Sequence, residues 1–162
     1  DIINKQHEFS TELVLRRLVI VSNKRTIEAL NQLLQGEYMA VESFNNFISR
    51  LEEGNVKQAF IEVQKQHREN IDKLASYIQF IGGQPDENLG MKGYMGDMML
   101  NMQLGPDSDT NEIIKKAIEG ETKGVNMAEK VLRGDLDERS RDIAGEVLHK
   151  DRKSIEKIKS LL

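Results

Sequence analysis

Four stretches of the sequence repeat apolar residues at intervals of three or four, the spacing of one face of an α-helix. They cover residues 24–53, 56–81, 110–133 and 136–162. An apolar stripe of this kind is stable in water only when it is packed against another, so the four helices are expected to share one core. The pattern predicts an all-α protein, a four-helix bundle with a long crossover at residues 82–109 between the second and third helices.

The composition of the chain excludes or disfavours several classes of function. A chain of 162 residues can bury a sizeable core as one domain. The absence of Cys excludes disulfides, thiol catalysis and thiolate metal sites. The net charge of −4, without a dense basic run, argues against a nucleic-acid partner. No run of eighteen apolar residues exists, so we expect no membrane span, and without a signal-peptide pattern we expect a cytoplasmic protein.

Residues 1–22 precede the bundle and carry an imperfect amphipathic pattern. They predict an extra N-terminal helix over about 6–20, after which Ser22 or Asn23 caps the first bundle helix. We therefore divide the chain into an N-terminal packing or oligomerisation segment, 1–22, and the bundle, 23–162. The segment is expected to pack on the bundle or on another subunit, which makes a homo-oligomer the expected state, with an unidentified protein partner as a further option.

The crossover holds most of the methionines of the chain. Four of them fall on one face of an expected short helix: Met91, Met95, Met98 and Met102. Met adapts to irregular gaps, so filling of the core is the main interpretation. Recognition of a partner peptide and binding of a soft metal are the alternatives.

Each apolar stripe also contains one side chain that could ligate a metal: Glu37, His67, Glu121 and Asp151. Counted from the shared end of the bundle, three of them lie about eleven residues deep, whereas Glu37 lies about sixteen deep. At a rise of ~1.5 Å per residue this offsets Glu37 by about 7 Å. No Lys or Arg lies on the stripes at this level, so three buried carboxylates would repel one another and take up protons.

A divalent metal, bound with a ring nitrogen of His67, would relieve that repulsion. Oxygen-rich ligands with one imidazole suit iron or manganese. A metal-free layer of protonated carboxylates is an equally plausible alternative, and the replacement Glu121→Leu would then stabilise the metal-free protein. Enzymatic activity is not favoured, because no nucleophile or phosphate-cradling loop accompanies a Glu37/Asp151 acid–base pair.

Two short motifs add a family resemblance. Gly82-Gly83-Gln84-Pro85 follows the second helix, and Glu119-Gly120-Glu121 lies in the third. With these motifs, residues 23–162 resemble the ferritin-like superfamily, and within it a poorly characterised branch of bacterial four-helix proteins. The resemblance implies a ferritin-like bundle and no agreed reaction, since that branch has none.

Di-iron members of the superfamily place Glu on helices one and three and Glu-x-x-His on helices two and four. Here the second helix has Gln64 in the acidic position before His67. The fourth helix has Glu146-x-x-His149, which lies off the apolar stripe and is therefore discounted. Glu37 precedes His67 by thirty residues, as Glu119 precedes His149, an echo typical of two repeated hairpins.

The resemblance therefore implies a reduced single-metal site, or a scaffold that has lost its metals. The single-metal site favours iron or manganese handling in stress. The alternative is a metal-free structural or protein-interaction module that uses the Met-rich crossover and the N-terminal segment.

Overall fold

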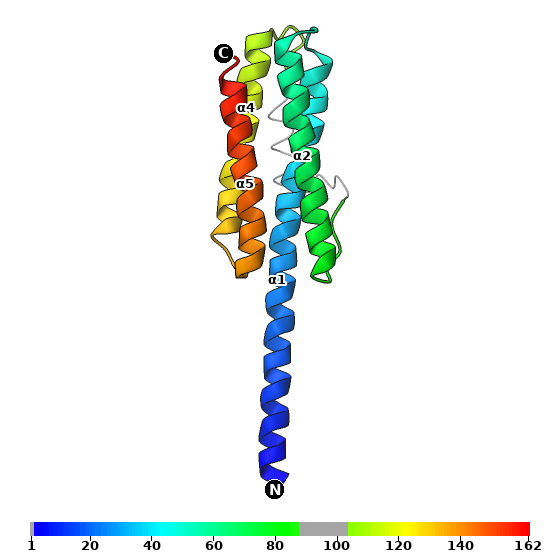
Figure 1. The fold of residues 1–162 in the computed structure, drawn as a ribbon, viewed down its shortest axis with the longest axis vertical. Coiled ribbons are helices and arrows are strands. Elements are labelled where there is room, and N and C mark those ends of the chain that lie inside the picture. The colour runs from blue at the N-terminus through cyan, green and yellow to red at the C-terminus, as the bar shows by residue number, and fades with distance from the viewer. Residues whose placement is uncertain (1, 88–103) are drawn as a thin grey trace.

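The structure is a computed structural model that describes residues 2–87 and 104–162, and these form four helices and no strand. The helices are α1 (Ile2–Ser49), α2 (Asn55–Phe80), α4 (Thr110–Leu132) and α5 (Glu138–Lys159). Helices α1 and α2 form one hairpin, α4 and α5 form the other, and the two hairpins pack side by side (Figure 1). This confirms the predicted all-α four-helix bundle with its long crossover. The expected Met-rich helix lies outside the described residues.

The predicted break between the N-terminal segment and the bundle is wrong. Helix α1 runs without interruption through Ser22 and Asn23 and projects well beyond the other helices (Figure 1). The side chain of Asn23 does not cap a helix but donates a hydrogen bond to the carbonyl of Ile81 at 3.2 Å. No Gly or Pro interrupts the sequence upstream, so nothing ends the helix there. Among the described residues, no helix combines the length and the apolar content that a membrane crossing requires.

The double glycine after α2 ends that helix, as predicted. Gly82 has φ of 84°, a left-handed conformation that glycine adopts without steric cost. A Cβ on Gly83 would lie 2.9 Å from side-chain atoms of Ile27 and Ile78, so only glycine lets the chain pass this close to α1. The chain then follows α1, where the side chain of Asn31 bonds to the backbone of Gln84 and of Asp86.

Two aspartates begin the helices of the second hairpin. Asp109 forms a capping box with Glu112 at the start of α4. Asp137 accepts a hydrogen bond from the backbone N–H of Ser140 at the start of α5. Both caps satisfy backbone donors that the first helical turn leaves free, which fixes where these two helices begin.

The apolar core is divided into two clusters by a layer of polar side chains. One cluster lies toward the end of the bundle from which α1 projects and includes Leu30, Leu34, Leu74, Ile78, Val125 and Val147. The other lies toward the opposite end and includes Phe44, Phe47, Phe60, Val63, Ile113 and Ile158. The polar layer between them contains the residues predicted to form a site.

Candidate metal centre

One polar side chain from each helix points into the centre of the bundle. Glu37 on α1, His67 on α2, Glu121 on α4 and Asp151 on α5 are all less than 8% exposed. Each lies on the apolar stripe of its helix, so the packing that buries the stripe also buries the polar group. The structure thus brings together all four residues that the sequence analysis selected.

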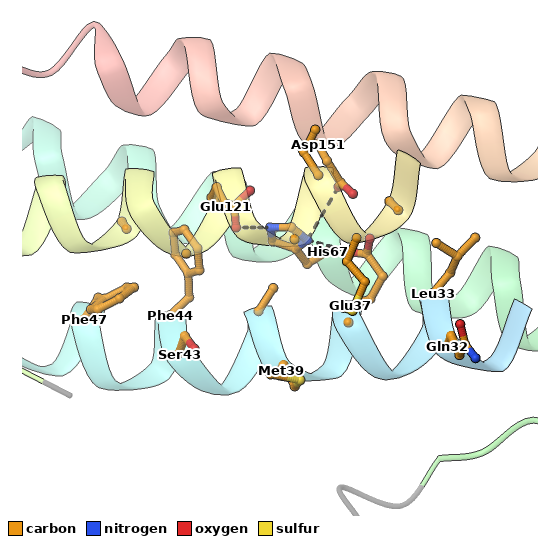
Figure 2. Close-up of a pocket in the computed structure, with 18 residues that line it drawn as sticks. Gln32, Leu33, Glu37, Met39, Ser43, Phe44, Phe47, His67, Glu121 and Asp151 are labelled. Carbon is orange, nitrogen blue, oxygen red and sulfur yellow. Dashed lines mark hydrogen bonds and ion pairs between the residues drawn. The ribbon is translucent and has the colours of Figure 1, made fainter. Parts of the chain in front are cut away.

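The imidazole of His67 lies between two carboxyl groups (Figure 2). Its Nδ1 is 2.6 Å from Oε2 of Glu37, and its Nε2 is 2.9 Å from Oε1 of Glu121. Oδ1 of Asp151 lies 3.7 Å from the same Nδ1. When both ring nitrogens carry protons, they donate to both carboxylates, and His67 then bridges α1 and α4 as an imidazolium.

The predicted offset of Glu37 is wrong, because helix α1 ends at Ser49 and not near residue 53. Glu37 therefore lies twelve residues from the end of α1, and His67 lies twelve residues from the start of α2. The turn between these helices begins earlier than the sequence suggested. The backbone N–H groups of Arg50 and Leu51 donate hydrogen bonds to the carbonyl oxygens three residues earlier, as in a turn, and not four residues earlier. The two side chains are consequently level with each other.

Asn70 is a member of the centre that sequence reasoning missed. It is fully buried, and its amide donates to Oδ1 of Asp151 at 2.9 Å and to Oε2 of Glu37 at 3.3 Å. It lies three residues after His67 and therefore one turn along the same face of α2. The spacing of three residues from His67 could have identified Asn70 in the sequence, since a buried hydrogen-bonding group beside a candidate ligand commonly orients that ligand.

The electrostatics of the centre follow from burial and from the close approach of like charges. Burial lowers the pKa of His67, but the charges of Glu121 and Glu37 and their hydrogen bonds outweigh it, so the pKa lies well above the usual range. Burial and the charge of Glu37 raise the pKa of Asp151 well above its usual range, although the charge of His67 opposes them. In the described part of the chain, no buried side-chain polar atom lacks a hydrogen-bond partner.

Three of the four side chains offer atoms that one metal ion could share. A carboxylate oxygen of Glu37, a ring nitrogen of His67 and a carboxylate oxygen of Asp151 all lie within 4.8 Å of one another. The donor set of two carboxylates and one imidazole fits a divalent ion such as Fe²⁺ or Mn²⁺. Glu121 lies on the other side of the ring, at Nε2.

A cavity of about 60 Å³ opens between α1 and α4 and reaches the centre. Small side chains line its walls: Gly36, Ala40, Ala117, Gly120, Gly124 and Ala128. A water molecule needs only about 10–15 Å³ of such space. The cavity therefore has room for a partly hydrated ion beside Glu37, His67 and Asp151.

The remaining motif residues lie away from the centre. Gln64 donates to the carbonyl of Val41 and to the side chain of Asn45. Glu146 and His149 are exposed, and Glu146 pairs with Lys73. Glu146-x-x-His149 therefore lies outside the centre, as the sequence predicted.

Inside the bundle, the spacing of thirty residues is repeated by a pair other than Glu119 and His149. Glu119 is exposed and pairs with Lys116 and Lys123, so it has no place in the centre. Inside the bundle, the pair that matches Glu37 and His67 is Glu121 and Asp151, which are also thirty residues apart. Each hairpin therefore supplies its two central groups at the same spacing.

Solved structures confirm the fold. A dodecameric thioferritin, the bacterioferritin-related protein of Bacteroides fragilis, is 17% identical with a TM-score of 0.65, and the match covers 85% of this chain and 84% of that one. A protein from Bacillus anthracis, described among ferritin-like diiron-carboxylate proteins, is 20% identical with a TM-score of 0.63, covering 87% of this chain and 97% of that one. A conserved hypothetical protein from Mycobacterium tuberculosis is 19% identical with a TM-score of 0.69, covering 86% and 98%.

Family membership is shown by sequence. No curated protein matches the chain significantly. A family described as a domain of unknown function, DUF2383, matches residues 25–134, which is more than half of the chain and includes three of the four central residues. The chain therefore belongs to the DUF2383 family, and its fold is the ferritin-like four-helix bundle.

Proposed function

We propose that this protein binds one divalent transition-metal ion, iron or manganese, in the centre of the bundle through Glu37, His67 and Asp151. The observation that carries the proposal is the convergence of three buried donor atoms from three helices within 4.8 Å. Among the described residues, no Lys or Arg is a hydrogen-bond or ion-pair partner of the three buried acids Glu37, Glu121 and Asp151, so their full ionisation would leave the pocket with a net negative charge. A bound cation would supply the missing positive charge.

In this proposal Glu121 orients the ring and is not a ligand. If Nδ1 of His67 binds the ion, Nε2 carries the proton and needs an acceptor, and Glu121 lies 2.9 Å from it. A carboxylate in this position fixes the tautomer of a metal-bound histidine and raises its basicity. Asn70 supports the two carboxylate ligands in the same way, by donating to both.

The proposal is for one ion rather than two. A pair of metal ions in the di-iron arrangement needs a carboxylate three residues before the second-helix and fourth-helix ligands. Those positions hold Gln64 before His67 and Leu148 before Asp151. Gln64 is turned toward Val41, and Leu148 is part of the apolar core. Neither can bridge two ions, so storage or handling of single metal ions in stress is favoured over di-iron chemistry.

A second candidate is a metal-free polar layer that fixes the register of the four helices. It is favoured by the completeness of the hydrogen bonding around His67 and Asn70, since every buried side-chain polar atom of the described residues has a partner. Such a network specifies one packing arrangement even where it adds little stability. The two candidates differ in whether metal stabilises the protein.

Titration of metal-free protein with Mn²⁺, and anaerobically with Fe²⁺, separates them. At one hundred times its Kd, a bound ion stabilises the fold by about 2.7 kcal/mol. For a chain of this size that raises Tm by roughly 5–10 °C. Asp151→Asn should abolish the rise, whereas the exposed control His149→Ala should preserve it. Absence of any rise in the unmodified chain would contradict metal binding and favour the polar layer.

A further inference from the structure

The N-terminal part of α1 exposes a long apolar surface outside the bundle. Residues 7–25 are all exposed, and Thr26 is the first buried residue after them. Eight large apolar side chains in this segment are 45–69% exposed: Phe9, Leu13, Val14, Leu15, Leu18, Val19, Ile20 and Val21. Figure 1 shows this part of α1 extending away from α2, α4 and α5.

The exposed residues occupy more than one face of the helix. Phe9, Leu13 and Ile20 share one face, whereas Val14, Leu18 and Val21 share another at intervals of four and three. A helix that is apolar on several sides is normally buried. The segment therefore needs a partner.

The charges along the segment indicate which partner fits. Residues 7–15 contain two acids, Glu8 and Glu12, and no Lys or Arg. Residues 16–25 contain four basic residues, Arg16, Arg17, Lys24 and Arg25, and no acid. If a second copy lay antiparallel, the acidic half of each segment would face the basic half of the other. If it lay parallel and in register, the four basic residues of one copy would face the four basic residues of the other.

The second apolar face continues onto the bundle. Leu18 and Val21 line a groove whose other wall is formed by Leu136 and its neighbours in the turn between α4 and α5. A helix lying along Val14, Leu18 and Val21 would extend into this groove. The surface available to a partner therefore includes the base of the bundle as well as the projecting helix.

We propose that residues 7–22 of α1 pair antiparallel with the same segment of a second copy, which makes the protein a dimer with its two bundles at opposite ends. The overlap of sixteen residues is about 24 Å long. Apolar burial supplies the attraction, and the opposed charges fix the orientation. The pairing is independent of the proposed metal centre, which lies inside each bundle.

Sedimentation of the whole 162-residue chain at tens of micromolar tests the proposal, and the unmodified chain should be a dimer. In this antiparallel register position 12 faces Arg17, and position 8 faces Val21, one turn from both Arg17 and Arg25. The double variant Glu8→Lys/Glu12→Lys therefore adds like charges at both places, and dimerisation should weaken at least about tenfold. In a parallel dimer the same change would exchange facing acids for facing lysines and have little effect. Mixing this variant with Arg16→Glu/Arg17→Glu should restore a mixed dimer.

The matched control is Glu52→Lys/Glu156→Lys, which changes the net charge equally at exposed positions of the bundle. It should remain dimeric. Helical content and Tm report whether each variant keeps its bundle, which the projecting segment does not help to form. A monomeric unmodified chain, or an oligomer that the Glu8/Glu12 variant leaves intact, would overturn the proposal, as would equal dissociation of the control.

Discussion

The two hairpins contribute to the centre at the same spacing but with different chemistry. The first supplies Glu37 and, thirty residues later, His67. The second supplies Glu121 and, thirty residues later, Asp151. Only the first hairpin therefore provides a ring nitrogen. The two sides of the imidazole differ as a result. Nδ1 faces two possible metal ligands, Glu37 and Asp151, whereas Nε2 faces Glu121, which can orient the ring.

The largest effect should come from removing the one basic group of the centre. His67→Leu leaves Glu37 and Glu121 buried without their shared imidazolium, so the free energy of unfolding at pH 7 should fall by about 3–5 kcal/mol. Urea unfolding of the metal-free protein measures it. The exposed residue His149 gives the matched control, because His149→Leu should change stability by less than about 0.5 kcal/mol. Equal effects of the two replacements would contradict the assigned role of His67.

The second hairpin should tolerate the corresponding loss at Asp151 much better. Burial raises the pKa of this carboxyl, so Asp151→Leu exchanges a desolvated acid for a packing group. Asn70 keeps its bond to Glu37. The metal-free variant should therefore lie within about 1 kcal/mol of the unmodified protein. A loss of unfolding free energy as large as that caused by His67→Leu would contradict the expected difference between the two hairpins.

Glu121→Leu should destabilise the metal-free protein by about 1–3 kcal/mol, because it leaves the Nε2 proton of His67 without an acceptor. The sequence alone predicted the opposite sign, since it showed a carboxylate on an apolar stripe but not its partner. Thermal unfolding in the presence of a chelator decides between the two. A raised Tm would mean that the ion pair contributes less than apolar packing at this position.

The smallest effect is the pH dependence. The folded protein holds the proton of His67 more tightly than the unfolded chain does, so this contribution to stability is fully present below about pH 6.5 and is lost as pH rises through the folded pKa. The raised pKa of Asp151 acts in the same direction from about pH 4 upward. Stability of the metal-free protein should therefore decline as pH rises above about 6.5.

His67→Leu should flatten the upper part of that decline, whereas His149→Leu should not. Metal affinity should show the opposite trend and increase with pH, because the ion must displace the proton on Nδ1. Urea unfolding and Mn²⁺ titration across the same buffers measure both trends. Rising metal-free stability over this range would contradict the imidazolium in the centre.

Helical periodicity was enough to find the fold and the four central residues, because a polar group on an apolar stripe must be buried with the stripe. It could not find the end of α1 at Ser49, since the turn residues Arg50 and Leu51 suit a helix equally well. It missed Asn70 because Asn rarely marks a ligand by itself. It also placed a cap at Ser22 or Asn23, where α1 continues and the side chain of Asn23 bonds across to Ile81.

Anomalous diffraction from crystals soaked in Mn²⁺ tests the central claim most directly. We predict one peak per chain, bounded by Glu37, Asp151 and Nδ1 of His67, with the contact between Nε2 and Glu121 kept. Two peaks, a peak on the Nε2 side, or no peak in the bundle at saturating metal would contradict the proposed single-ion centre.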